Sequence, residues 1–251
     1  MVLGLTASLL FVLPLLGIVL RIPWDTLLEQ ATSPAVLTAL WISLTTSLAA
    51  TALCLLFGVP LAWVLVRASF PGRELLRALT TLPVVLPPIV GGVALLLVFG
   101  REGFLGGPLY AWTGIQLPFS MAGTILAQTF VAMPFLVLSV SGALQSMDGR
   151  LEEAARTLSA SRWTVFWRIT LPALRPSLVA GAVLCWARAL GEFGATITFA
   201  GNFPGRTQTL PLAVYGALET DLDAAITLSV VMLVVSLSVL IGLRRYWFGL
   251  R

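Results

Sequence analysis

Long apolar runs recur along the chain, separated by short segments that hold nearly all of the charged residues. An apolar run of about 20 residues is long enough to cross a bilayer as a helix. The pattern predicts an all-α polytopic membrane protein with about six transmembrane helices, forming one domain over residues 1–251. The expected spans lie near residues 3–20, 36–66, 82–99, 121–140, 177–199 and 224–243.

The first two runs differ in length. The run 3–20 is near the lower limit for crossing hydrocarbon, and it has neither a positive region before it nor a small-x-small cleavage site, so we expect an uncleaved first span. The run 36–66 exceeds about 20 residues, which predicts a tilted helix or one that extends beyond the bilayer. Gly58 and Pro60 are expected to kink it.

Prolines and glycines interrupt the third run at Pro87, Pro88, Gly91 and Gly92. Such interruptions free backbone polar groups, which lipid cannot satisfy but neighbouring protein or a water-filled cavity can. This helix is therefore expected to face the interior of the bundle.

Composition strengthens the membrane prediction. Hydrophobic residues make up 58% of the chain, charged residues 10%, and the mean hydropathy is +0.98. Soluble domains carry about 25% charged residues. The net charge of +4 does not predict nucleic-acid binding, because the arginines cluster in a few short loops where they determine orientation.

The arginines are distributed unequally between the two sides that six spans define. Cytoplasmic loops carry an excess of Arg and Lys, which places the richer side, both termini and the segment 141–175 in the cytoplasm. That side holds Arg67, Arg73, Arg77, Arg150, Arg156, Arg162, Arg168, Arg175, Arg244, Arg245 and Arg251, and the other side holds Arg21, Arg101 and Arg206.

Several kinds of catalytic site are excluded by absent residue types. The chain has no histidine, and all 15 of its basic residues are arginine, which excludes a Walker A lysine, a Schiff-base lysine, a His-based triad and an H-E-x-x-H zinc site. Cys54 and Cys185 both lie in apolar runs, where we expect small core residues rather than metal ligands. We therefore expect no enzyme activity, cofactor or metal in this chain, and any ATP hydrolysis must occur on another chain.

The charged segment from Asp148 to Pro172 predicts two short helices on the membrane surface. Asp148 is the expected N-cap of the first helix, whose apolar stripe is Leu151, Ala154, Ala155 and Leu158. The second is expected to begin at Ser161, to carry its aromatic side chains on one side, and to end at Pro172 because proline disfavours helical geometry in the residue before it. Those aromatic residues are Trp163, Phe166 and Trp167.

The same segment resembles the EAA loop of ABC-importer permeases, written E-A-A, three residues, Gly, nine residues, I-x-L-P. The matching positions are Glu153, Ala154, Ala155, Ile169, Leu171 and Pro172, with Ser159 in place of the glycine. Serine enters left-handed geometry less readily than glycine, so this departure concerns the turn. The resemblance implies that the loop docks into a cleft on a separate ATPase subunit. The alternative is an amphipathic helix pair that touches only lipid.

The fifth run contains charges within the hydrocarbon, Arg188 and Glu192, which are spaced to share one helix face. Intramembrane charges are costly and usually face the bundle interior, which makes the pair, with the hydroxyls of Thr196 and Thr198 nearby, a candidate transport pathway. The alternative is a purely structural ion pair, since Glu192 already neutralises the arginine that an anion would need.

The stretches ARALGEFGATITFAGN, residues 187–202, and PGRTQTLPLAVY, residues 204–215, resemble molybdate or tungstate importer permeases, and the first also resembles sulfate permeases. This resemblance implies the pore subunit of an ATP-driven oxyanion importer in a bacterial or archaeal plasma membrane. The implied partners are an ABC ATPase subunit, an extracytoplasmic oxyanion-binding protein and a second copy of the chain, all assembled at the lipid bilayer.

Two other classes remain open. A secondary transporter would need ionisable groups for a proton relay or ion site and usually internal repeats, whereas this chain offers one Arg–Glu pair. A membrane enzyme would have to rely on carboxylate chemistry.

Overall fold

The structure is a computed structural model that describes residues 2–148 and 150–242. Within these ranges the elements are helices and no strand occurs, so the all-α prediction is confirmed. Four described stretches are long and apolar enough to cross a membrane: Pro34–Arg67, Met121–Ser146, Trp163–Leu190 and Leu222–Gly242. Two more apolar stretches, Thr6–Leu20 and Pro88–Phe99, are shorter. The described residues form two compact units, one from those up to Thr45 together with 201–242, the other from Thr46–Ala200.

The first unit combines a segment from the N-terminal part of the chain with one from the C-terminal part. It contains α1 (Val2–Leu20), α2 (Leu27–Ala31), the start of α3 (Pro34–Leu53), α13 (Leu210–Leu218) and α14 (Leu222–Gly242). Val36 and Ala39 of α3 share a core cluster with Leu210 and Leu228. Polar contacts fix the same helices: the Leu210 N–H donates to Ser43 Oγ at 2.7 Å, and the Thr227 hydroxyl donates to Gln30 Oε1 at 2.8 Å.

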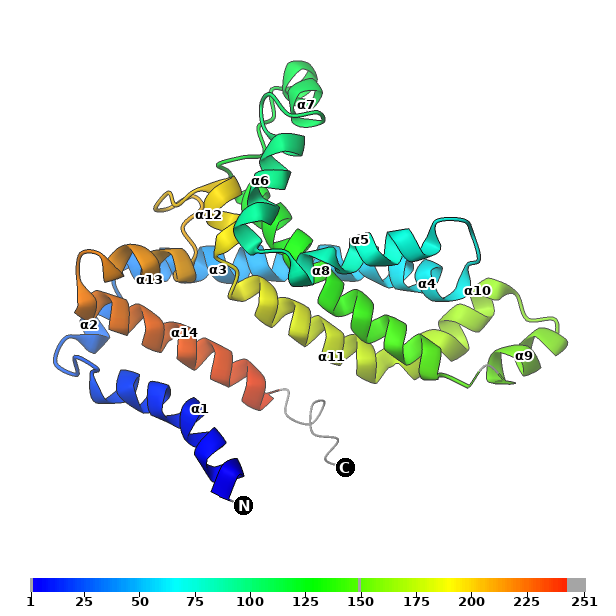
Figure 1. Cartoon of the computed structure of the whole chain (residues 1–251), viewed down its shortest axis with the longest axis horizontal. Coiled ribbons are helices and arrows are strands. Elements are labelled where there is room, and N and C mark those ends of the chain that lie inside the picture. Colours follow the sequence, from blue (N-terminus) through cyan, green and yellow to red (C-terminus); the bar gives the residue numbers. More distant parts are fainter. Residues whose placement is uncertain (1, 149, 243–251) are drawn as a thin grey trace. The chain divides into compact units, whose positions relative to one another are not determined.

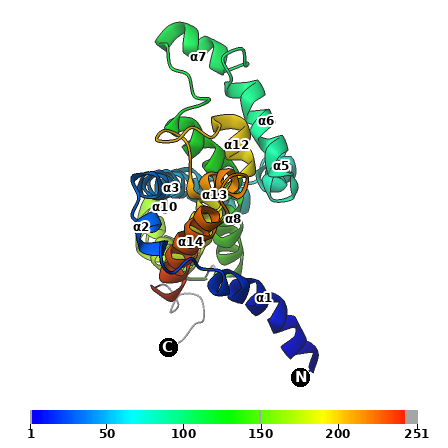
Figure 2. The same cartoon turned by 90° about the vertical axis from the view of Figure 1, so that its left-hand side faces the viewer.

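The second unit is organised around α8. This helix packs against α4, α5, α11 and α12 (Figure 1), and Leu136, Val137, Val140 and Leu144 are among its buried residues. The unit comprises the end of α3, η1 (Cys54–Gly58), α4 (Val59–Arg67), α5 (Arg73–Val85), α6 (Pro88–Phe99), α7 (Gly106–Thr113), α8 (Met121–Ser146), α9 (Arg150–Thr157), α10 (Arg162–Val165), η2 (Phe166–Thr170), α11 (Leu171–Leu190) and α12 (Gly194–Ala200). Figure 2 shows α6 leading through a short turn into α7.

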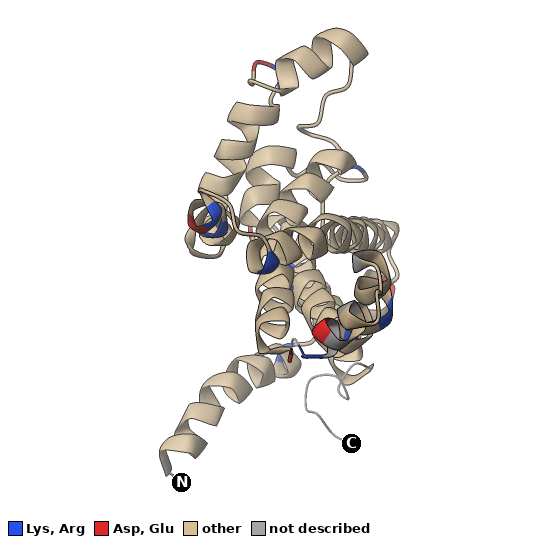
Figure 3. Cartoon of the chain, turned by 90° about the vertical axis from the view of Figure 1, so that its right-hand side faces the viewer, with Lys and Arg blue, Asp and Glu red and all other residues tan. Residues whose placement is uncertain are grey.

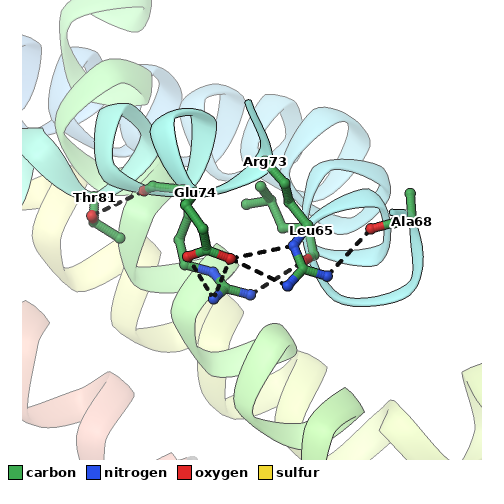
Figure 4. A network of polar contacts seen from close by, with 6 residues as sticks. Leu65, Ala68, Arg73, Glu74 and Thr81 are labelled. Carbon is green, nitrogen blue, oxygen red and sulfur yellow. Dashed lines mark hydrogen bonds and ion pairs between the residues drawn. The ribbon is translucent and has the colours of Figure 1, made fainter. Parts of the chain in front are cut away.

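Charged residues are confined mainly to helix ends and connecting segments, as Figure 3 shows. At the turn between α4 and α5 they form a network (Figure 4). The guanidinium of Arg77 donates to the Leu65 carbonyl at 3.1 Å and that of Arg73 to the Ala68 carbonyl at 3.4 Å, while both arginines contact Glu74. These bonds satisfy carbonyls at the C-terminal end of α4, which have no partner within the helix, and so define the turn.

The residues of the third predicted span, 82–99, do not form one continuous helix. Residues 82–85 are the end of the amphipathic helix α5, and α6 begins only at Pro88. Leu86 is extended, with φ −67° and ψ 132°, because proline excludes the residue before it from helical geometry. Gly91 and Gly92 are buried, as expected for an inward-facing helix.

The fourth and fifth predicted spans also differ from the structure. The fourth, 121–140, continues as α8 to Ser146, because buried Leu144 keeps this end of the helix packed although the sequence becomes more polar. The fifth, 177–199, is not one helix: α11 ends at Leu190, three residues leave the helix, and α12 begins at Gly194.

The predicted loop 141–175 is mostly helical. It overlaps the end of α8 and the beginning of α11, and the second helix does not end at Pro172. Instead α10, the π-helical turn η2 and α11 run on without interruption. Proline lacks an N–H and its ring clashes with the carbonyl four residues earlier, which for Pro172 belongs to Arg168 in η2, and the wider π turn relieves that clash. Pro60 follows the π turn η1 in the same way, at the irregularity expected near Gly58.

Candidate functional site

The segment that matches the EAA pattern begins with α9. Asp148 Oδ1 accepts the backbone N–H of Arg150 at 3.0 Å, which supplies an acceptor at the start of the helix. Glu153 is exposed to solvent, and Leu158 is 83% exposed, so one member of the expected apolar stripe is left uncovered by this chain. The side chains of Leu151 and Ala154, which belong to the same stripe, lie outside the described residues, as do those of Glu152 and Arg156.

Ser159 adopts the left-handed conformation for which the family pattern has glycine. Its φ is 62°, and the Ala160 N–H donates to the Ala155 carbonyl at 3.1 Å. This bond across five residues is typical of the Schellman ending of a helix, with Ser159 at the left-handed position. The turn therefore forms with serine, at the steric cost that a Cβ atom brings in this region.

The second helix of the segment carries a cluster of aromatic rings. Ser161 Oγ accepts the Thr164 N–H at 3.1 Å and caps the helix. The Trp163 and Trp167 rings have centroids 5.5 Å apart, and Phe166 lies 5.5 Å from Trp167. Phe166 also meets the ring of Trp63 on α4 edge to face at 5.4 Å. Trp163 remains 70% exposed, so the cluster is anchored to α4 on one side and open on the other.

Ile169, Leu171 and Pro172 complete the pattern. They lie in the continuous helical run that α10, η2 and α11 form, rather than at a helix end. The described part of this run that is apolar enough to span a membrane, Trp163–Leu190, has 28 residues. The segment is therefore joined directly to the helix that carries Arg188.

The intramembrane charge pair lies at the break between α11 and α12. Arg188 Nη1 is 2.5 Å from Glu192 Oε2, so the predicted pairing forms although Glu192 has already left the helix. The other oxygen, Oε1, accepts the Ala195 N–H at 2.7 Å and caps α12. The Glu192 side chain is 1% exposed and that of Arg188 26%. Glu192 thus fixes both the arginine and the start of the next helix.

The two threonines predicted beside this pair differ in their surroundings. The Thr198 hydroxyl donates to the Gly194 carbonyl at 2.8 Å, within its own helix. The Thr196 hydroxyl is buried, and no described residue bonds to it. Of the two, Thr196 is therefore the one with hydrogen-bonding capacity to offer a ligand.

Close packing of α6 on α12 was missed at the sequence level. A Cβ atom on Gly92 would lie 2.6 Å from Thr198 Cβ and 2.9 Å from the Ala195 carbonyl oxygen, and one on Gly194 would lie 2.8 Å from Pro88 Cβ. The sequence signals for this close approach were the glycine pair Gly91–Gly92 and Gly194. Gln128, a buried amide within the apolar run of α8, was also missed, although a lone amide in such a run marks an inward face.

The sequence is similar to those of known membrane transport proteins. A family described as "Binding-protein-dependent transport system inner membrane component" matches residues 54–249. The chain belongs to this family. The molybdenum transport system permease protein ModB of Mycobacterium tuberculosis is 48% identical over 237 residues, covering 94% of this chain and 89% of that protein. A probable sulfate transport system permease protein, cysT, of Marchantia polymorpha is 40% identical over 224 residues, covering 89% of this chain and 77% of that protein.

The same fold occurs in a solved ABC importer. The crystal structure of a bacterial ABC transporter involved in the import of the acidic polysaccharide alginate aligns with a TM-score of 0.75 at 20% identity, covering 99% of this chain and 93% of that chain. At this identity the likeness concerns the fold. The chain is thus a multi-pass inner-membrane component with the permease fold.

Proposed function

We propose that this chain is the pore subunit of an ATP-driven importer for a tetrahedral oxyanion, with molybdate or tungstate as cargo. The observation that carries the proposal is the 48% identity to a molybdenum permease over nearly the whole chain. Sulfate is the second candidate cargo, because the sulfate permease relative is 40% identical over 89% of this chain.

In this proposal the energy comes from a separate ATPase subunit. The chain has no lysine and hence no P-loop side chain to contact the β and γ phosphates. Exposed Glu153, uncovered Leu158 and the open side of the Trp163 cluster are the surface that docks on that subunit. Lipid contact alone is a weaker explanation, since it accounts for the exposed apolar side chains but not for the exposed carboxylate of Glu153 on α9.

The continuity of the helix supplies a route for coupling. A run of 28 residues from Trp163 to Leu190 is about 42 Å long at 1.5 Å per residue. A displacement of its docked end is therefore carried as a rigid body to Arg188 near the other end. The edge contact between Phe166 and Trp63 links the same displacement to α4.

The proposal extends to the orientation of the chain and to its partners. We assign residues 1–251 to one transmembrane permease domain, with both termini and the coupling segment in the cytoplasm on the side richer in arginine. An extracytoplasmic binding protein delivers the oxyanion, in keeping with the words "binding-protein-dependent" in the family's description. Two copies of the chain form the pore in this proposal.

A substrate ranking tests the proposal. The chain is reconstituted with its ATPase subunit, and ATP hydrolysis is measured with the binding protein preloaded with molybdate, tungstate or sulfate. We expect molybdate and tungstate to stimulate hydrolysis more than sulfate does. Stimulation by sulfate alone would establish the second candidate instead, and no stimulation by any of the three would contradict the oxyanion assignment.

The docking surface is tested by reversing one charge. Glu153→Lys places a positive side chain among Arg150 and Arg156 and is expected to uncouple ATP hydrolysis from transport, lowering uptake at least tenfold while the chain still inserts. Glu102→Lys is the matched control, an exposed charge reversal in a connecting segment on the opposite predicted side. Normal uptake by the Glu153→Lys importer would contradict docking through α9.

A further inference from the structure

Three buried polar side chains of the second unit have hydrogen-bonding atoms that no described residue satisfies. They are Gln128 on α8, with both amide atoms unpaired, Trp186 on α11, through its indole Nε1, and Thr196 on α12, through its hydroxyl. Gln128 and Thr196 are 0% exposed and Trp186 is 8% exposed. Most buried side-chain polar atoms in proteins have a partner, so such atoms call for an explanation.

Helix packing brings these side chains to the same region of the unit. Ser139 Oγ donates to the Ser177 carbonyl, and a Cβ atom on Gly181 would contact Ser139, so α8 and α11 pair over these turns. Nearer the start of α8, Ala127 and Val131 share a core cluster with Ala195 and Phe199 of α12. Gln128 and Thr196 directly follow Ala127 and Ala195, and Trp186 lies one turn before the end of α11. All three therefore lie around the break between α11 and α12.

The charged residues at the same break are already satisfied. Glu192 uses one oxygen for Arg188 and the other for the Ala195 N–H, as described above. The unpaired groups are thus neutral, and two of them, the Trp186 indole and the amide nitrogen of Gln128, are N–H donors. A tetrahedral oxyanion presents only acceptor oxygens, so N–H and O–H donors can bind it. Neutral donors bind it weakly enough for it to leave again, which a transport path requires.

We propose that Gln128, Trp186 and Thr196 form an oxyanion contact site at the α11–α12 break, where they donate hydrogen bonds to the cargo as it crosses. This inference rests on the proposed function. The three groups are closed off from solvent here, so the site is filled only in the conformation that opens it to one side. Glu192 positions Thr196 by capping the helix that carries it.

The test removes each unpaired group, in the variants Gln128→Leu, Trp186→Phe and Thr196→Val. Gln128→Leu and Thr196→Val change the shape of the side chain little and remove a buried group without a partner, so both are expected to unfold at the wild-type temperature or above it. Trp186→Phe also leaves a small cavity and is expected to unfold somewhat below the wild-type temperature. Molybdate uptake by the assembled importer is expected to fall roughly tenfold in each variant, because one contact to the crossing anion is lost. Thr196→Ser keeps the hydroxyl and is expected to retain uptake.

The matched control is Thr129→Val, one residue from Gln128 on α8. The Thr129 hydroxyl already donates to the Ile125 carbonyl at 2.7 Å, so its removal is expected to leave uptake unchanged. Wild-type uptake by the three variants would overturn the site while leaving the importer assignment intact. A loss of uptake by Gln128→Leu and Thr196→Val that is matched by a lowered unfolding temperature would overturn it as well. If the wild-type importer carries none of the oxyanions, the proposed function is wrong, and so is the contact site, which depends on it.

Discussion

The pair formed by Arg188 and Glu192 allows a double-mutant cycle whose outcome the structure specifies. Arg188→Met removes the guanidinium and leaves the Glu192 carboxylate, 1% exposed, with the Ala195 N–H as its one remaining partner among the described residues. Breaking a buried pair by removing one partner costs about 3–5 kcal/mol, because an uncompensated charge stays buried. Arg188→Met is therefore expected to be strongly destabilising.

Glu192→Gln removes the charge but keeps an oxygen that can cap α12. The unpaired guanidinium is 26% exposed, so this variant is expected to lose less, about 1–3 kcal/mol. Combining Arg188→Met with Glu192→Gln removes both charges and retains the cap, and should cost about 1 kcal/mol or less, since neutral replacement of a buried pair is often tolerated. Using Glu192→Met in the double variant instead should cost about 1 kcal/mol more, through the lost cap.

The assay is equilibrium unfolding of the four purified proteins in the same detergent, followed by uptake in vesicles. We expect the double variant to be more stable than the sum of the single changes predicts by at least about 2 kcal/mol. Additive single effects, or an Arg188→Met protein as stable as wild type, would refute the reasoning. A folded double variant that imports at the wild-type rate would show the pair to be structural and would remove Arg188 from the pathway.

Three further predictions concern the turn, the helix packing and the energy source. Ser159→Gly removes the strain that a Cβ atom causes in the left-handed conformation, and it is expected to raise the free energy of unfolding of the coupling segment by about 1 kcal/mol. Hydrogen exchange of α9 should become slower, and unchanged exchange would contradict the prediction. Gly92→Ala is expected to lower the free energy of unfolding by about 1–3 kcal/mol, measured by thermal unfolding. Gly17→Ala is the control and should leave stability unchanged, because its Cβ atom would meet nothing within 4 Å. Equal effects of the two changes would contradict the close packing at Gly92. The purified chain alone should hydrolyse no ATP, and turnover in a preparation free of other subunits would disprove the need for a separate ATPase.

Hydropathy was sufficient to predict the helical class and the location of most long helices. An apolar run within lipid must satisfy its own backbone N–H and C=O groups, and an α-helix does so within a single segment. It was insufficient for α5, whose polar face of Arg73, Glu74 and Arg77 lowers the local hydropathy below that of a span. Helix existence thus followed from composition, whereas helix ends depended on contacts between elements.

The break at Glu192 shows why part of the site escaped prediction. A carboxylate four residues after an arginine is the spacing of a helical ion pair, and the pair does form. The competing role of Glu192, as cap of α12, depends on the three-dimensional path of the chain, although the flanking Gly191 and Gly194 were a signal for a turn. Pro172 is the opposite case, where a rule for ending helices was overridden by a π turn.

The central claim is that this chain moves an oxyanion with energy from a separate ATPase, and uptake into vesicles tests it most directly. Vesicles holding the chain and its ATPase subunit, with ATP inside and the binding protein and radiolabelled molybdate outside, should accumulate the label above its external concentration. Vesicles without ATP, or without the ATPase subunit, should not. Accumulation that needs an ion gradient but no ATP would contradict the account and indicate a secondary transporter.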